Sequence, residues 1–361
     1  MLDYLRNYGG VPFSDEPLND VDRLIFAQLA YMDFESVDRT DCSFSYALAH
    51  ASFADSDDPS EDRFSFQKKD DSQLALLAAS CPRYDSIRFA GFVRHFDPDA
   101  ETQFAALSLR LDQTHLLVAF RGTDNTLAGW KEDFNMAFMD EIPAQRMALD
   151  YLTAMGEDAG LITVCGHSKG GNLALYAASV CAYHIQEKIA LAVSFDGPGL
   201  NEHIVHSEGF ARMQGRMRAV LARSSLVGLL FEQPQDVRII DSRSFSALQH
   251  YPYFWKTAGM DFIYLARPGR SGVLLGKTVF GLMEKLSAEA REQLVEAVYG
   301  IISSSDADTF NDMAAGWVKS AASIASGLFQ TDAQTRRVFL SAAQAILSAA
   351  AEAAADMARA N

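Results

Sequence analysis

Cysteine is scarce in this sequence, and its few copies lack the spacing of a metal site. The 361 residues include four cysteines, with no C-x-x-C pair or comparable pattern. Cys165 and Cys181 fall in a predicted strand and helix, where a small apolar side chain is usually buried, so we expect free thiols. This pattern favours a reducing, intracellular setting. We therefore expect a cytoplasmic protein with no metal ion and no other cofactor.

Long apolar runs and positive charge are also lacking. No stretch of eighteen or more uncharged apolar residues occurs, so no transmembrane segment is expected. Residues 1–8 carry charges and lack the apolar core of a signal peptide. The chain has 31 Lys and Arg against 47 Asp and Glu, a formal net charge of −16. Such a surface would repel a phosphate backbone, which argues against a nucleic-acid partner, and it would resist an anionic membrane.

Short apolar runs alternate with helical patterns over the first 270 residues. This alternation predicts an α/β fold, with a mostly parallel central sheet covered by helices on both faces. The predicted strands are residues 103–111, 115–120, 161–165, 189–195, 217–222 and 235–240, of which 217–222 could equally be helical. The predicted helices are residues 19–34, capped by Asn19 or Asp20, then 144–155 and 172–182.

The composition changes near residue 270. From there to residue 361 the chain is rich in alanine, helical in period and without strand signals, so we expect a separate all-helical extension. Its alanine faces suit close packing, including packing against a second copy of the chain. Two other stretches stay open to interpretation: residues 55–62 resemble a solvated acidic loop, and residues 226–231 are core or line an acyl pocket.

A G-x-S-x-G pentapeptide, residues 166–170, lies between the predicted strand 161–165 and the helix 172–182. A strand, a sharp turn and a helix in this order raise the hydroxyl of the central serine, Ser168, out of the turn as a nucleophile. Side chains at Gly166 or Gly170 would collide where strand and helix nearly touch. A tight structural turn without catalytic function is the alternative.

A serine nucleophile needs a histidine base, which follows it in the chain on this fold. Of the later histidines, His184 precedes every plausible acid, and His203 and His206 lie in a polar segment that we expect at the surface. His250 lies in a loop-like aromatic cluster after the last predicted strand. We therefore favour His250, although a histidine among aromatic residues is often merely packed.

The carboxylate that would orient this base has two candidates. Asp196 ends the strand after the pentapeptide, and Asp241 ends a later strand. Ligands bind at the carboxyl ends of strands in open α/β sheets, so both positions suit the role. We favour Asp196, whose alternative is a turn cap for the bend at residues 197–199.

The oxyanion of an acyl-transfer intermediate needs two hydrogen-bond donors. The residue after the nucleophile supplies one backbone N–H on this fold, which points to Lys169. Thr123 follows the strand 115–120 and offers both an N–H and a hydroxyl as the second donor. Arg121 is expected to form a structural ion pair.

Several separate motifs, in order, resemble one family. The segments VAFRGTDN, with Trp130 and Asp133 downstream, and GHSKGGNLA resemble the class 3 (fungal-type) lipases. The segments GHSKGGNLALYAA, SFDGPGL, SSLVGLLFE and QHYPYFW, with residues 3–35, are similar to the Mbeg-like family of bacterial lipase-like proteins. The resemblance spans about residues 1–265. It implies an α/β-hydrolase fold with Ser168 as nucleophile, His250 as base and Thr123 at the oxyanion hole.

The chain departs from the class 3 pattern at two places. Ser225, Leu226 and Val227 stand where those lipases carry the triad aspartate, so the acid must come from elsewhere, and Asp196 is similar in placement to the acid of pancreatic-type lipases. Lys169 replaces the usual apolar residue after the serine. We expect it to put a charge at the rim of the site and to disfavour bulk triglyceride.

The leading hypothesis is a serine esterase or lipase-like hydrolase that forms an acyl-enzyme. Its substrate would be a small-molecule or lipid ester, such as a lysophospholipid or a short- to medium-chain acyl ester. The alternatives are a thioesterase or peptidase with the same triad, and a non-catalytic interaction protein that keeps the hydrolase scaffold.

Overall fold

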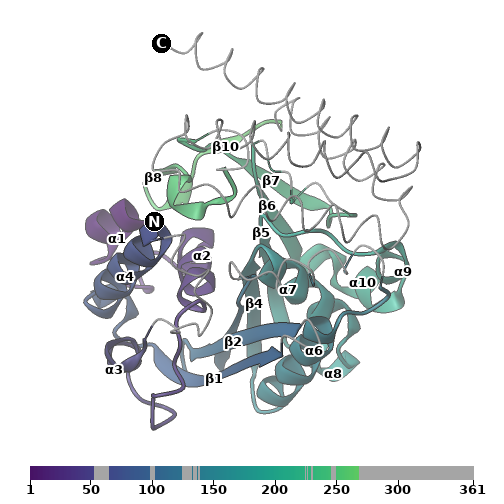
Figure 1. Ribbon diagram of the computed structural model, residues 1–361, viewed down its shortest axis with the longest axis horizontal. Helices are drawn as coiled ribbons and strands as arrows, with labels where there is room; N and C mark the ends of the chain where they lie inside the picture. Colours follow the sequence, from purple (N-terminus) through teal and green to yellow (C-terminus); the bar gives the residue numbers. More distant parts are fainter. Residues whose placement is uncertain are drawn as a thin grey trace, which may run out of the picture.

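The computed structural model in Figure 1 describes residues 1–52, 65–97, 102–123, 132, 136, 139–223, 225, 227–228, 231–244 and 249–267. The acidic stretch 55–62, Trp130, Asp133 and the alanine-rich extension 271–361 lie outside these residues, as does half of the apolar stretch 226–231. The division into a domain over residues 1–270 and an extension over residues 271–361 therefore stays a prediction.

An eight-stranded sheet runs through the middle of the molecule in the order β1-β2-β3-β4-β5-β6-β7-β10 (Figure 1). The strands β3 to β7 are parallel, and β1, β2 and β10 pair antiparallel with their neighbours. The bounds are β1 Arg88–Asp97, β2 Thr102–Arg110, β3 His115–Phe120, β4 Leu161–His167, β5 Ile189–Phe195, β6 Met217–Ala222, β7 Asp236–Ile240 and β10 Tyr264–Leu265. The predicted mostly parallel α/β sheet is confirmed, and residues 217–222 are a strand.

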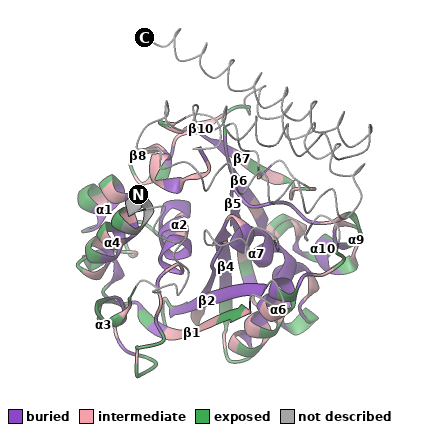
Figure 2. Cartoon of the chain, viewed as in Figure 1, coloured by how far each residue is buried: buried purple, intermediate pink, exposed green. Residues whose placement is uncertain are grey.

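Apolar side chains on both faces of the sheet explain why its strands read as continuous apolar runs. In β3, Leu117 and Ala119 join the core on one face, whereas Leu116, Val118 and Phe120 join the core on the other. This is the period-2 alternation of a strand with both faces buried. Figure 2 shows the central strands in the colour of buried residues. Because both faces of the sheet are packed, the residues at the ends of its strands have fixed positions.

Helices cover both faces. The N-terminal helices lie on one side of the sheet, and α6, α7 and α10 pack on the other (Figure 1). The N-terminal helices are α1 Leu2–Tyr8, α2 Asp20–Leu29, α3 Phe44–His50 and α4 Ser65–Ala79. The others are α6 Pro143–Gly156, α7 Lys169–Val180, α8 Tyr183–Gln186, α9 Glu202–Val205 and α10 Glu208–Met213, with short 3-10 turns η2 Pro82–Tyr84, η3 Gln214–Arg216 and η5 Pro252–Phe254. A separate hairpin pairs β8 Thr257–Ala258 with β9 Asp261–Phe262.

The N-terminal helix α2 begins where its capping signal lies but ends early. Asn19 Oδ1 accepts from the Val21 and Asp22 amides, and the Asp22 carboxylate accepts from the Asn19 amide, which forms a capping box. The helix ends at Leu29 rather than at residue 34, because the next amides turn back in tighter bonds, such as Met32 N–H to Leu29 O. Tyr31 is thereby released from the helix.

A buried ion pair connects α2 to Arg83 in the turn η2, which precedes β1. Arg83 donates to both carboxylate oxygens of Asp22, with Nη2 and Oδ2 2.6 Å apart, and both side chains have no exposed surface. Tyr4 and Tyr84 also donate to Asp22. The remaining Arg83 donors bond to main-chain carbonyls of residues 11–17. These bonds satisfy both buried charges and fix α2 relative to the core.

Candidate active site

Ser168 occupies a strained turn between β4 and α7. Its backbone has φ 57° and ψ −131°, a conformation with positive φ that residues other than glycine rarely adopt. The Ser168 amide donates to Phe195 O at 2.9 Å, and its carbonyl accepts from the Gly171 amide at 2.9 Å. These bonds hold the turn, and the serine side chain is half-buried at the carboxyl edge of the sheet.

The two glycines of the pentapeptide are required by close approach of main chains. A Cβ at Gly166 would collide with the carbonyl of Gly170, and one at Gly170 would collide with the carbonyl of Phe120 at the end of β3. At Gly171 an added Cβ would meet the Ser194 hydroxyl. The expected contact between strand and helix is confirmed, and it extends to the neighbouring strand.

His250 lies within hydrogen-bonding distance of both Ser168 and Asp196. His250 Nε2 is 2.9 Å from Ser168 Oγ, and His250 Nδ1 is 2.7 Å from Asp196 Oδ2. Because a carboxylate only accepts, Nδ1 carries the hydrogen and Nε2 is free to accept the serine hydroxyl. The three side chains thus form one continuous hydrogen-bonded chain.

Asp196 is fully buried directly after β5, with φ 51°. Its Oδ1 accepts from the Ala222 amide at 2.9 Å, while Oδ2 faces His250. The main-chain donor holds the carboxylate in place in the absence of solvent. Asp196 therefore lies where an orienting carboxylate is needed.

Asp241, the other candidate, forms an ion pair with Lys256. Its Oδ2 pairs with Lys256 Nζ at 2.7 Å, and its Oδ1 accepts from the Ser242 amide. Its amide donates to Ile263 O, and its carbonyl accepts from the Lys256 amide. Asp241 ends β7 at the same edge of the sheet, but its carboxylate bonds to this later segment.

The Lys169 side chain is buried, so the expectation of a charge at the rim is wrong. It is 1% exposed, and its Nζ lies 2.5 Å from Glu132 Oε2 and 2.8 Å from Gln103 O. Glu132 is itself buried and accepts from the amides of Gln103 and Ala144. The Lys169 ammonium is therefore neutralised in the interior of the protein by direct contact with the Glu132 carboxylate.

Lys169 directly follows Ser168, and Gly122, which precedes Thr123, lies close to Ser168. A Cβ added at Gly122, just before Thr123, would lie 3.1 Å from Ser168 Cβ and 2.5 Å from His167 O. It would also collide with the hydroxyl of Tyr31. Gly122 therefore lies against the turn at Ser168, and the Tyr31 hydroxyl reaches the same point from the N-terminal part of the chain. Arg121 is buried beside it.

The other histidines after Ser168 lie away from it. His203 and His206 are exposed, as expected, and His184 is exposed as well and pairs with Glu157. Two residues that the sequence did not single out do lie at the site. His167 bonds to the main-chain carbonyl of His250, and Tyr31 lies beside His167. Only their placement in space reveals them.

Comparison with known proteins identifies the family. The family model named Mbeg1-like matches residues 78–300, which is more than half of the chain. The chain belongs to the Mbeg1-like family. A search of curated proteins finds no significant match. Among solved structures, the chain is similar to the crystal structure of M37 lipase, with 14% sequence identity and a TM-score of 0.39, over 59% of this chain and 70% of that one.

The Mbeg1-like match starts after the N-terminal helices α1 to α3 and most of α4. The resemblance to Mbeg-like proteins is thus confirmed, and the fold is the expected α/β type with a mostly parallel sheet and with Ser168 at the strand-to-helix turn. Tyr31 lies outside the matched residues. In this Mbeg1-like protein, a segment that the family model does not cover therefore contacts the candidate site.

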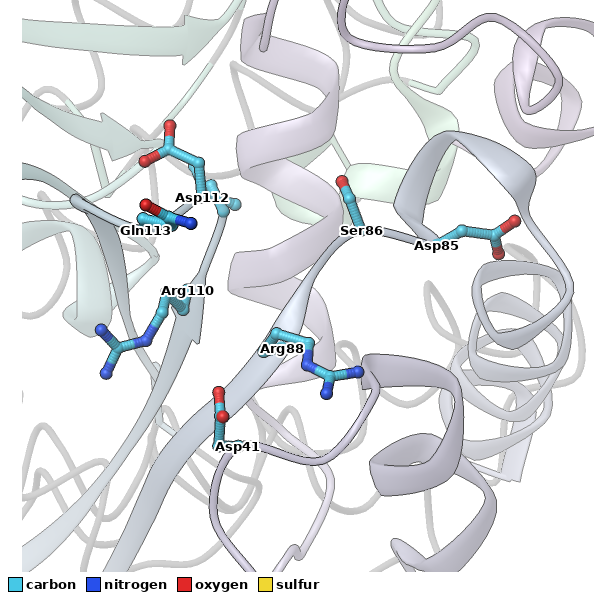
Figure 3. A pocket seen from close by; sticks show the side chains of 8 residues that line it. Asp41, Asp85, Ser86, Arg88, Arg110, Asp112 and Gln113 are labelled. Carbon is cyan, nitrogen blue, oxygen red and sulfur yellow. The ribbon is translucent and has the colours of Figure 1, made fainter.

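A surface hollow lies at the end of the sheet opposite to Ser168. It has a volume of about 930 Å³, and its lining comes from the start of β1, the end of β2 and nearby turns, as Figure 3 shows for Arg88 and Arg110. Asp41, Asp85 and Asp112 line it too, so its charges are mixed. It lies at the amino ends of the parallel strands, whereas Ser168 lies at their carboxyl ends.

Within the described part of this Mbeg1-like chain, no cluster of three or more His, Cys, Asp or Glu side chains is arranged to hold a metal ion. The four cysteines are buried and unpaired, as expected for Cys165 and Cys181. Over the same residues, the helices include none that is both long and apolar enough to span a bilayer.

Proposed function

We propose that this protein is a serine hydrolase that cleaves carboxylic esters through an acyl-enzyme on Ser168. The observation that carries the proposal is the hydrogen-bonded chain from Ser168 Oγ through the His250 ring to the buried Asp196 carboxylate. A serine hydroxyl is a weak nucleophile at neutral pH, and this chain supplies both the base and the group that orients it. The strained turn at Ser168 supports the same role.

In acylation, Ser168 Oγ attacks the ester carbonyl carbon while its proton moves to His250 Nε2. The carbonyl oxygen becomes an oxyanion, and His250 becomes an imidazolium that the Asp196 carboxylate stabilises through Nδ1–H. When the intermediate collapses, the carbon–oxygen bond to the leaving alkoxide breaks, and the proton on Nε2 passes to that oxygen. The products are an alcohol and the acyl ester of Ser168.

Deacylation repeats these steps with water in place of the alcohol. His250 Nε2 removes a proton from the water, the hydroxide adds to the acyl carbon, and the proton returns to Ser168 Oγ as the carboxylic acid leaves. We assign the oxyanion to the Lys169 backbone N–H and to Thr123. Gly122, between the strand β3 and Thr123, lies so close to Ser168 that a Cβ added there would be 3.1 Å from Ser168 Cβ, which supports this assignment.

The Lys169 ammonium does not restrict the substrate in this proposal. Because it is buried against Glu132, it presents no charge to an incoming acyl chain. Apolar lipid esters therefore remain substrates to be tested beside short esters.

A fluorophosphonate probe tests the nucleophile. Wild type should be labelled covalently, and Ser168→Ala should not. Ser80→Ala is the control, because Ser80 is an exposed serine whose hydroxyl bonds to the carbonyls of Leu76 and Leu77. Equal labelling of wild type and Ser168→Ala, or no labelling of well-folded wild type, would overturn the proposal and favour a non-catalytic scaffold.

A panel of p-nitrophenyl esters of increasing acyl length, beside matched thioesters, tests the substrate class. The proposal predicts that kcat/KM is higher for at least one ester than for its thioester counterpart. Uniformly higher values for the thioesters would identify a thioesterase instead.

A further inference from the structure

The backbone around His250 is held by two buried aromatic rings. Trp255 Nε1 donates to Gln249 O at 2.8 Å, and His167 Nε2 bonds to His250 O at 2.9 Å. Both rings are almost fully buried, with Trp255 2% and His167 5% exposed, and they contact each other edge to face. Two consecutive carbonyls at the proposed base are therefore fixed by ring N–H groups.

The contact with His250 O determines which nitrogen of His167 carries hydrogen. A carbonyl oxygen only accepts, so Nε2 is the donor. Burial and, to a lesser degree, the neighbouring His250 together lower the pKa of His167 to about 3, against smaller raising effects of Asp196 and of the hydrogen bond to the His250 carbonyl. The ring is therefore neutral, with an unprotonated Nδ1 that faces the Tyr31 hydroxyl 3.5 Å away. The hydroxyl is thus placed to support this tautomer.

A neutral ring is what the reaction requires at this place. The centroids of His167 and His250 are 4.7 Å apart, with 33° between the planes. When His250 accepts the serine proton, a second positive charge at this distance would oppose it. His167 therefore holds the main chain of His250 through a hydrogen bond and adds no charge beside its ring.

We infer that His167 is a positioning residue that holds the ring of His250 in line with Ser168, and that Tyr31 supports His167 from the N-terminal segment. The inference rests on the proposed function, because it concerns the base of that reaction. The inference assigns a role to His167 as the first variable residue of the G-x-S-x-G pentapeptide. It also makes residues outside the family match part of the active site.

Two variants of similar length separate the hydrogen bond from packing. In His167→Gln the side-chain amide can place its nitrogen near the position of Nε2 and donate to His250 O, whereas His167→Met fills similar space without a donor. For a p-nitrophenyl ester, we expect His167→Met to lower kcat about tenfold or more, the factor typical of one buried hydrogen bond. His167→Gln should recover most of this loss, and KM should change little in both variants.

The two proposals fail in different ways. If wild type neither reacts with the fluorophosphonate nor turns over esters, the proposed function is wrong. If wild type is active and His167→Met and His167→Gln have equal kcat, only the role of His167 is wrong. Should His167→Met not fold, Tyr31→Phe decides, since it removes only a half-buried hydroxyl: a lower kcat at constant KM supports the inference, and an unchanged kcat overturns it.

Discussion

Asp196 and His250 are 54 residues apart in the chain, yet Asp196 Oδ2 and His250 Nδ1 lie 2.7 Å apart. We predict that Asp196→Asn lowers kcat by about 10³–10⁴-fold, because an amide that donates to Nδ1 favours the wrong histidine tautomer. Steady-state turnover of a p-nitrophenyl ester measures this.

Asp241→Asn is the matched control. It removes a carboxylate at the end of the strand β7, in a partly exposed pair with Lys256. Turnover should stay near that of wild type. A large loss in Asp241→Asn, with little loss in Asp196→Asn, would reverse the assignment.

Gly170 leaves no room for a methyl group. An added Cβ would collide with Phe120 O, a main-chain atom that cannot move aside without disturbing β3. We predict that Gly170→Ala lowers the free energy of unfolding by ~2–4 kcal/mol, through overpacking. Denaturant unfolding measures the change.

Gly215→Ala is the control for this substitution. Nothing lies within 4 Å of an added Cβ at that position. Its free energy of unfolding should stay within about 1 kcal/mol of wild type, with a slight gain from reduced chain entropy in the unfolded state. Equal stability of the two variants would contradict the steric argument.

The fold and the serine turn follow from local sequence patterns. The strands β3 and β5 begin and end at the predicted residues, because their apolar runs are buried on both faces. The strand β1 was missed, since it is an edge strand whose polar residues, such as Arg94 and His95, interrupt the apolar pattern. The helix α4 was missed as well, and its hydrophobic periodicity is weak.

The contacts of the site are less predictable, because they join distant parts of the chain. Asp196 and Asp241 both end strands, and only the path of the chain after β7 brings His250 to the first of them. Lys169 looked exposed because its partner, Glu132, lies 37 residues earlier in a segment without a clear pattern. Tyr31 and His167 are 136 residues apart, so no spacing in the sequence connects them.

The buried pair of Lys169 and Glu132 should be important for stability. Glu132→Gln leaves the Lys169 ammonium in the core without its anion, which typically costs about 3–5 kcal/mol. We predict a loss of this size in the free energy of unfolding. Asp150→Asn is the control, because it removes an exposed pair with Arg146 that should contribute less than about 0.5 kcal/mol. Similar stabilities of the two variants would show that the buried ammonium is tolerated without its partner.

A buried carboxyl behind the His250 loop should make stability depend on pH. Asp71, in α4, is 5% exposed, and its Oδ1 accepts from Tyr253 Oη at 2.6 Å and from Gln28 Nε2 at 2.8 Å. Burial raises the pKa of Asp71 to about 7; the hydrogen bonds from Tyr253 and Gln28 oppose the rise, and neighbouring Asp70 adds to it. Asp70 in turn accepts from Tyr251.

Between about pH 4 and pH 7 the folded protein keeps a proton on Asp71 that the unfolded chain has released, so the contribution of Asp71 to stability falls as the pH rises through this window. Asp71→Asn has no such proton. We predict that its stability relative to wild type increases by ~1–3 kcal/mol from pH 4 to pH 8, as measured by denaturant unfolding at each pH. Asp70→Asn, a change of the neighbouring and more exposed carboxylate, should show no comparable gain. If the difference between Asp71→Asn and wild type does not vary with pH, Asp71 is ionised throughout this range in the folded protein.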